Sequence, residues 1–195
     1  MARTKSENFD GIKEEILVSA AKLFAEKGFR NTNIIDIGNA CNASKSRLYH
    51  YFPSKEVMLE AMLTAHVEGL IKLAALGLDT SEPAELRFRR YVFIHLKYYY
   101  DHRDQHTVLI EDADHLPEAA RLAVNRAEQK LVGFLVAILR ELNEKRFGDK
   151  SIATTHAMLI YGMLNWTYTW YRPTGKLSLE SLADQASALC LNGII

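Results

Sequence analysis

Residues 42–55 read NASKSRLYHYFPSK, and this stretch decides how the N-terminal part of the chain is interpreted. Ser44 is a favoured helix-capping residue, and a Pro-Ser pair follows Phe52, so we predict a short helix over residues 45–51. Leu48 and Phe52 are four residues apart and therefore share one face of that helix. Because so short a helix is marginal in water, these two side chains must hold it against a core.

A second short helix is predicted immediately upstream. Asn33 can cap a helix over residues 34–41, and Asp36 is placed to complete a capping box. Residues 42–44 then form a tight turn. Two short helices joined by such a turn are typical of the helix-turn-helix unit, although a three-helix packing unit with a solvated face would give the same pattern.

The outward face of the helix predicted over residues 45–51 mixes cationic and aromatic side chains. If this helix enters a major groove, Arg47 is the best candidate for a bidentate contact with guanine. Lys55 begins the next predicted helix, whose free N–H groups favour an anion, and the start of the upstream helix offers a similar site. The predicted DNA-contacting residues are Thr32, Asn33, Ser44, Lys45, Ser46, Arg47, Tyr49, His50, Tyr51 and Lys55.

Helical periodicity continues along the rest of the chain, which predicts an all-α protein of about nine helices. Strand-like alternation is scarce, and only four prolines occur. Prolines and glycines between apolar-periodic segments mark the expected helix ends. Bounds can be placed for eight of the predicted helices, at about residues 12–27, 34–41, 45–51, 55–76, 83–103, 118–145, 151–171 and 178–192.

Charge is distributed unevenly, although the 195 residues have a formal net charge of zero. Residues 1–55 contain nine Lys or Arg and six Asp or Glu, so this end carries +3 and the remainder −3. The basic surface therefore belongs to the predicted helix-turn-helix end, as expected for a nucleic-acid contact.

The sequence lacks the signals that are typical of several other classes of protein. The chain shows no signal-peptide core and no apolar run of the roughly 20 residues that a membrane span needs, so we predict a cytoplasmic protein without a membrane partner. Gly-rich phosphate loops and hydrolase motifs are absent, so we predict no enzyme activity, no catalytic residue and no cofactor. His102 and His106 have possible metal-ligand spacing, but ordinary helix ends look the same, and we predict no metal site.

Residues 12–63 resemble the N-terminal domain of the tetracycline-repressor (TetR) family of bacterial transcriptional regulators. The shared features are A-x-x-L-F-x-x-x-G-F at residues 20–29, D-I at 36–37 and L-Y-x-Y-F-x-x-K-E at 48–56. The turn departs from the family pattern, because Cys-Asn-Ala stands at residues 41–43 where Ala-Gly-Val is usual. Asn tolerates a left-handed conformation better than any residue except Gly, so the turn can survive.

Two further departures lie on the predicted DNA face. Ser46 stands where the family usually has a small residue, often Gly, and Arg47 stands where Thr is common. We expect these two residues to alter the choice of operator without abolishing DNA binding.

The resemblance implies a DNA-binding domain over residues 1–55 and a ligand-binding and dimerisation domain over residues 56–195, linked by the helix over about 55–76. In this family the last two helices form the dimer interface, which here implies contacts by Leu179, Leu182, Ala186 and Leu189. Broad apolar faces on the predicted helices agree with this expectation.

The C-terminal part also resembles a subgroup that responds to acyl-CoA thioesters, through Asn165, Trp166, Trp170 and residues 171–173. Trp166 and Trp170 share a helix face, which fits packing at the dimer interface at least as well as lining of the pocket. Arg103 and Arg126 lie beside other candidates and could suit the phosphates of CoA. The predicted ligand contacts are Tyr98, Tyr99, His102, Arg121, Asn125, Asn165, Trp166 and Trp170.

These observations together predict a homodimeric, ligand-responsive repressor that binds a pseudo-palindromic operator. The alternatives are a multidrug-sensing or other small-molecule-sensing regulator of the same fold, a helical ligand-binding protein without a DNA role, and a small helical enzyme. The sequence identifies neither the effector nor the operator, and activation in place of repression stays open.

Overall fold

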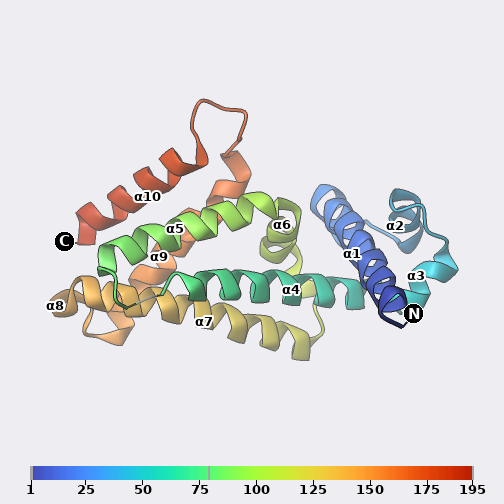
Figure 1. The fold of residues 1–195 in the computed structure, drawn as a ribbon, viewed down its shortest axis with the longest axis horizontal. Coiled ribbons are helices and arrows are strands. Elements are labelled where there is room, and N and C mark those ends of the chain that lie inside the picture. Colours follow the sequence, from blue (N-terminus) through green and yellow to red (C-terminus); the bar gives the residue numbers. More distant parts are fainter. Residues whose placement is uncertain (1, 79, 195) are drawn as a thin grey trace. The chain divides into compact units, whose positions relative to one another are not determined.

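The computed structural model describes residues 2–78 and 80–194 (Figure 1). These residues form ten α-helices and one 3-10 helix, with no strand among them, which confirms the predicted all-α class. The helices are α1 (Ala2–Lys27), α2 (Ile34–Ala40), α3 (Lys45–Tyr51), α4 (Lys55–Leu76), α5 (Ala84–Asp101), α6 (Arg103–Asp112), η1 (Ala113–His115), α7 (Glu118–Leu142), α8 (Glu144–Phe147), α9 (Lys150–Trp170) and α10 (Leu179–Ile194).

Helices α6 and α8 were not predicted, because the sequence pattern assigned no helix to residues 104–117 and continued the helix over 118–145 through the break at Asn143. Helix α5 ends because His102 adopts a non-helical backbone with φ −121° and ψ 44°, and α6 begins at the next residue. Helix α8 starts anew because the Asn143 side chain caps it by accepting from the Arg146 N–H at 3.1 Å. Helix α1 also begins earlier than the amphipathic pattern indicated.

The chain divides into two compact units. The first contains the chain up to His66 together with Asp104–Val124, and the second contains Val67–Arg103 and the chain from Asn125 onward. Helices α4 and α7 therefore each contribute residues to both units.

The core of the first unit lies where the helical pattern placed it. Phe24 of α1, Ile37 of α2, and Leu48 and Phe52 of the α3 segment are all at most 1% exposed. Leu48 and Phe52 thus hold the short helix α3, as the sequence predicted, because burying their apolar surface offsets the cost of forming so short a helix.

The second unit is built around α5, which packs against both α9 and α10. Its buried residues include Phe88, Val92 and Leu96 of α5, at four-residue spacing. Within the described residues, every helix falls short of the length or the apolar character that crossing a bilayer requires.

Candidate DNA interface and effector site

Local hydrogen bonds fix the two helices of the helix-turn-helix unit. Asn33 Oδ1 accepts from the N–H groups of Ile35 and Asp36 at 2.9 and 3.0 Å, and Asp36 Oδ2 accepts from the Asn33 N–H at 3.1 Å. This is the predicted capping box. At the start of α3, Ser44 Oγ accepts from the Arg47 N–H at 3.2 Å, so the predicted cap is also confirmed.

The turn between α2 and α3 depends on Asn42. Its φ of 51° lies in the left-handed region, and it is the only non-glycine residue with positive φ among the described residues. The next N–H, from Ala43, donates to the Gly38 carbonyl at 2.9 Å and closes the turn. Asn therefore takes over the conformation for which the family uses Gly, as the sequence analysis expected.

Helix α3 presents one continuous solvent-facing surface. Ser44, Lys45, Ser46, Arg47, Tyr49 and His50 are all exposed. The Lys45 ammonium lies 5.8 Å from the centroid of the Tyr49 ring, a cation–π contact that orients both side chains. Helix α3 is thus buried on its apolar side and carries cationic and hydrogen-bonding groups outside.

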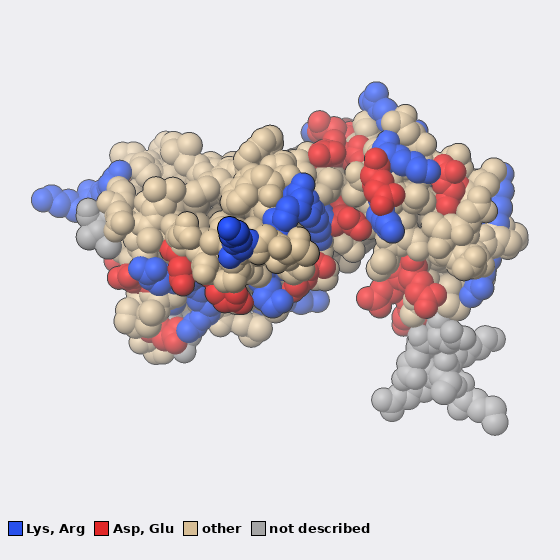
Figure 2. Space-filling model, turned by 90° about the horizontal axis from the view of Figure 1, so that it is seen from above, with Lys and Arg blue, Asp and Glu red and all other residues tan. Residues whose placement is uncertain are grey.

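Beside this surface lies a groove of about 620 Å³. Its lining includes Asn33 at the start of α2, Lys45 and Tyr49 of α3, and Ser54 and Lys55 at the start of α4. Figure 2 shows Lys and Arg side chains among acidic ones at the right-hand end, where Figure 1 places α2 and α3.

Arg30 and Asn31 line the same groove, and both are exposed. Neither residue was predicted from the sequence to contact DNA, because both lie in the link between α1 and α2, outside any helical pattern. Their position on the groove adds one cation and one amide to the candidate DNA interface.

Three residues predicted to contact DNA are engaged elsewhere in the structure. Thr32 is 1% exposed, and its hydroxyl lies 3.2 and 3.0 Å from the carbonyl oxygens of Leu23 and Gly28, to which it donates. Tyr51 packs against Phe9, with ring centroids 4.6 Å apart. Thr32 and Tyr51 therefore make contacts within the first unit that stabilise the structure supporting the candidate DNA interface.

Lys55 is the third of these residues. Its Nζ donates to the carbonyl oxygens of Phe29 and Thr32 at 2.8 and 3.1 Å and lies 4.3 Å from the centroid of the Phe29 ring. Two of its three N–H donors are thus used to tie the α1–α2 link to the start of α4.

Lys55 and Arg30 are expected to respond differently to replacement by Ala. Lys55→Ala should lower the melting temperature, because two carbonyl oxygens lose a charged donor. Arg30→Ala should leave the melting temperature unchanged and reduce the slope of log affinity against log salt by about one unit per protomer. Thermal unfolding and DNA titration at three salt concentrations measure both effects, and a lower slope for Lys55→Ala without loss of stability would return Lys55 to the phosphate contacts.

The interior of the second unit contains a buried chain of polar side chains. The His95 Nδ1 lies 2.8 Å from the Tyr91 carbonyl, and its Nε2 lies 3.1 Å from the Tyr161 hydroxyl. The Tyr161 and Tyr91 hydroxyls are 2.5 Å apart, and the latter donates to the Leu131 carbonyl at 2.7 Å. This network joins α5, α7 and α9 at the centre of the unit.

Burial in the second unit changes pKa values so that the neutral form of each group is favoured. Desolvation lowers the pKa of His95 to about 4, so its imidazole is neutral near pH 7. Desolvation also raises the pKa of Tyr99, and Glu128 on α7 has a raised pKa for the same reason. The interior thus offers mainly neutral hydrogen-bonding groups.

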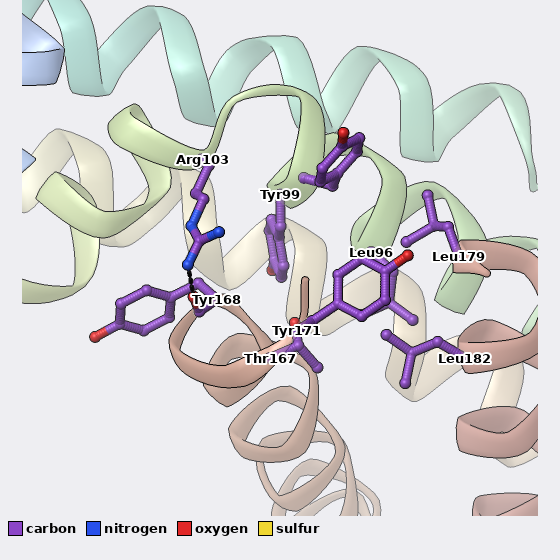
Figure 3. A pocket seen from close by; sticks show the side chains of 9 residues that line it. Leu96, Tyr99, Arg103, Thr167, Tyr168, Tyr171, Leu179 and Leu182 are labelled. Carbon is purple, nitrogen blue, oxygen red and sulfur yellow. Dashed lines mark hydrogen bonds between the residues drawn. The ribbon is translucent and has the colours of Figure 1, made fainter. Parts of the chain in front are cut away.

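A cavity of about 20 Å³ lies close to this network (Figure 3). Its lining includes Leu96, Tyr99 and Arg103 from the α5–α6 region, and Thr167 and Tyr171 from the end of α9. One Arg103 N–H donates to the Tyr168 carbonyl at 2.7 Å, the bond drawn as a dashed line in Figure 3. Such a volume holds about one water molecule, so a larger ligand requires the helices to separate.

The predicted ligand residues are not gathered at one place. Tyr99 lines the small cavity, and Tyr98 is buried, with its ring centroid 4.2 Å from that of His102. Asn165 is half-buried, and its Oδ1 is buried without a hydrogen-bond partner. Arg121 belongs to the first unit, and Asn125 is an exposed residue of the second.

Trp166 and Trp170 lie on an exposed apolar face that α9 and α10 share. They are 64% and 50% exposed, and Leu189 of α10 is 69% exposed. A groove of about 490 Å³ between the two helices is lined by Trp170, Leu182, Ala186 and Leu189, among others. Figure 2 shows a broad area without charged side chains in the left-hand part of the view, where Figure 1 places the second unit.

The histidines considered for a metal lie in different surroundings. His106 is buried with its ring centroid 5.8 Å from that of His66, whereas His102 caps α5. Within the described part of the chain, no group of three His, Cys, Asp or Glu side chains is arranged to hold a metal ion.

Comparison with known proteins places this arrangement in a family. The model described as "Bacterial regulatory proteins, tetR family" matches residues 16–62, and "Tetracyclin repressor-like, C-terminal domain" matches residues 81–194. The HTH-type transcriptional repressor KstR2 of Mycolicibacterium smegmatis is 29% identical, over 93% of this chain and 90% of its own.

Solved structures show the same fold over nearly the whole chain. A TetR-family transcriptional regulator from Bordetella parapertussis 12822 has a TM-score of 0.89 at 39% identity, covering 93% of this chain and 94% of that one. AibR, solved in complex with isovaleryl coenzyme A and operator DNA, has a TM-score of 0.80 at 22% identity, covering 91% and 97%. The chain therefore belongs to the TetR family of bacterial helix-turn-helix transcriptional repressors and is not an enzyme.

Proposed function

We propose that this repressor is a homodimer that releases a pseudo-palindromic operator when an acyl-CoA thioester binds within residues 56–195. Residues 1–55 bind the DNA, with Arg47 reading a base and with Lys45, Tyr49, His50 and Arg30 contacting phosphates or base edges. The exposed face of α3 and the groove beside it support this assignment, because they bring cations and hydrogen-bond donors to one surface.

The proposed class of effector is inferred from the residues that line the small cavity, which include Arg103. Apolar and tyrosine side chains around it suit an acyl chain, and a guanidinium suits the phosphates or carbonyl of a CoA thioester. AibR, which shares this fold, holds isovaleryl coenzyme A together with operator DNA, which supports the same class here.

The small volume of the cavity suggests how the effector acts. An acyl chain fits only if α5, α9 and α10 move apart, since the cavity holds about one water molecule. Two of these helices carry the proposed dimer interface, so the ligand would prefer a different separation of the two recognition helices. Such differential binding is what lowers operator affinity.

Dimerisation is assigned to the apolar face of α9 and α10. Leu189, Trp166 and Trp170 together leave more apolar surface exposed than isolated surface residues usually do. Pairing this face across a two-fold axis buries it and presents two α3 helices to successive major grooves. In this arrangement both tryptophans belong to the interface and not to the pocket.

Thermal shift with a panel of ligands tests the effector class. The panel contains short branched, long-chain, aromatic and steroid-derived acyl-CoAs, with free CoA and the matching free acids as controls. At about 100 times its dissociation constant, an effector should raise the melting temperature by roughly 5 °C or more.

Two variants sharpen the same experiment. Arg103→Ala should reduce the shift, whereas Arg140→Ala, at an exposed arginine of α7 that was not a ligand candidate, should preserve it. A shift with the free acid alone would favour a different small-molecule sensor, and the absence of any shift with an acyl-CoA would refute the proposed effector class.

A further inference from the structure

The link between α1 and α2 is held by residues that lie far away in the sequence. The main-chain N–H of Phe29 donates to Asp112 Oδ2 at 3.0 Å, across 83 positions of the chain. Both residues belong to the first unit and both are buried, at 5% and 8% exposure. This is a tertiary contact on the segment that leads directly into the helix-turn-helix.

Phe29 needs a partner because of the turn before it. The Gly28 N–H still bonds to the Phe24 carbonyl, but Gly28 has φ of +81°, which ends the helix and redirects the chain. The Phe29 N–H is therefore outside the α1 helical ladder, and a buried N–H without an acceptor is costly. The Asp112 carboxylate is that acceptor.

The same carboxylate also meets a histidine that packs on Phe29. His115 Nε2 lies 3.7 Å from Asp112 Oδ1, and the His115 ring is stacked on the Phe29 ring with centroids 5.3 Å apart and planes at 27°. Lys55 holds the Phe29 carbonyl oxygen at 2.8 Å. Phe29 is thus contacted at its N–H, its ring and its carbonyl oxygen.

The position of Phe29 affects the DNA-binding surface through the following residues. The Thr32 N–H donates to the Phe29 carbonyl at 3.4 Å, and Asn33 then caps α2. Helix α2 in turn packs against α3. A shift of Phe29 therefore moves the start of α2 and, through it, the exposed face of α3.

From this geometry we infer that Asp112 and His115 are positioning residues for operator binding. Neither side chain lines the groove beside α3, and a carboxylate repels phosphate, so neither acts by touching DNA. They act by fixing the α1–α2 link in the position that presents α3. The inference goes beyond the proposed function, because it holds for DNA binding whichever effector the protein takes.

The first test compares variants at Asp112 by fluorescence anisotropy, with the full-length protein and a duplex selected by the wild type from random DNA. Asp112→Ala removes the acceptor and should weaken binding about tenfold, whereas Asp112→Asn keeps an oxygen acceptor and should stay within about threefold of wild type. Asp114→Ala is the matched control, since Asp114 is an exposed neighbour of the same charge.

Affinities are measured well below the melting temperature of each variant, so that a change in the folded fraction does not enter. Equal affinities for Asp112→Ala and Asp114→Ala would overturn the inference, as would Asp112→Asn binding as weakly as Asp112→Ala. Hydrogen exchange supplies a local readout: the Phe29 amide should lose protection in Asp112→Ala and keep it in Asp112→Asn.

His115 provides an independent test if Asp112→Ala does not fold. His115→Ala removes the stacked ring and should weaken operator binding by about threefold, and His115→Phe restores a ring against Phe29 and should recover wild-type affinity. Wild-type affinity in His115→Ala, or equal losses in His115→Ala and His115→Phe, would count against a positioning role.

Discussion

A Leu189→Asp variant is expected to be a folded monomer that binds the operator at least about 100-fold more weakly than the wild type. Leu189 is 69% exposed in the protomer, so a charge there leaves the helix packing of the protomer intact. In the proposed dimer the same side chain is buried against the partner, where an unpaired carboxylate is strongly unfavourable. A monomer reaches one half-site at a time and loses the gain of roughly 100-fold or more from bivalent binding.

Light scattering measures the oligomeric state of the variant, and fluorescence anisotropy measures its affinity for the operator. Leu86→Asp is the matched control, because Leu86 on α5 is 51% exposed and lies outside the α9–α10 face. Leu189 is a sharper site for this test than Leu182, which is 7% exposed within the protomer and would damage the fold if charged. Intact dimers of Leu189→Asp would place the interface elsewhere.

Leu48→Ala is expected to lower the stability of the DNA-binding unit by about 3–5 kcal/mol, the cost of emptying a fully buried site. Leu48 is 0% exposed and is the only buried residue within α3. Because this helix of seven residues has little stability of its own, losing its anchor should free α3 and abolish specific operator binding. The dimer should persist, since its proposed contacts lie in α9 and α10.

The Arg47→Ala variant distinguishes the recognition of the operator by α3 from the packing that holds α3 in place. Arg47 is exposed, so its removal should leave thermal stability unchanged while costing about 1–3 kcal/mol of operator binding and relaxing the preference for one base. Circular dichroism and competition between duplexes with single base changes measure both variants. Stable, tightly binding Leu48→Ala protein would mean that α3 is held by other contacts.

The sequence was sufficient wherever local rules decide the structure. The four-residue spacing of Leu48 and Phe52 predicted the buried face of α3, and the Asn33 and Ser44 caps follow from residue type and position. The left-handed turn at Asn42 was predictable for the same reason, because few residues accept that conformation.

Local rules of this kind do not predict contacts between segments that are distant in the sequence. Lys55 was expected to meet phosphate, but its carbonyl partners lie 26 and 23 residues away and come within reach only in the folded unit. The Asp112–Phe29 bond and the His95–Tyr161 contact likewise follow no helical period. The sequence therefore predicted the local geometry of the helix-turn-helix, but not the long-range contacts that hold it.

Control of DNA binding by an effector is decided by the affinity of the dimer for its operator, measured with and without the acyl-CoA that gives the largest thermal shift. A saturating concentration should weaken operator binding by about 5- to 150-fold, a coupling of roughly 1–3 kcal/mol, whereas free CoA should leave it unchanged. An operator affinity that is the same with and without bound acyl-CoA would show that acyl-CoA binding does not control DNA binding.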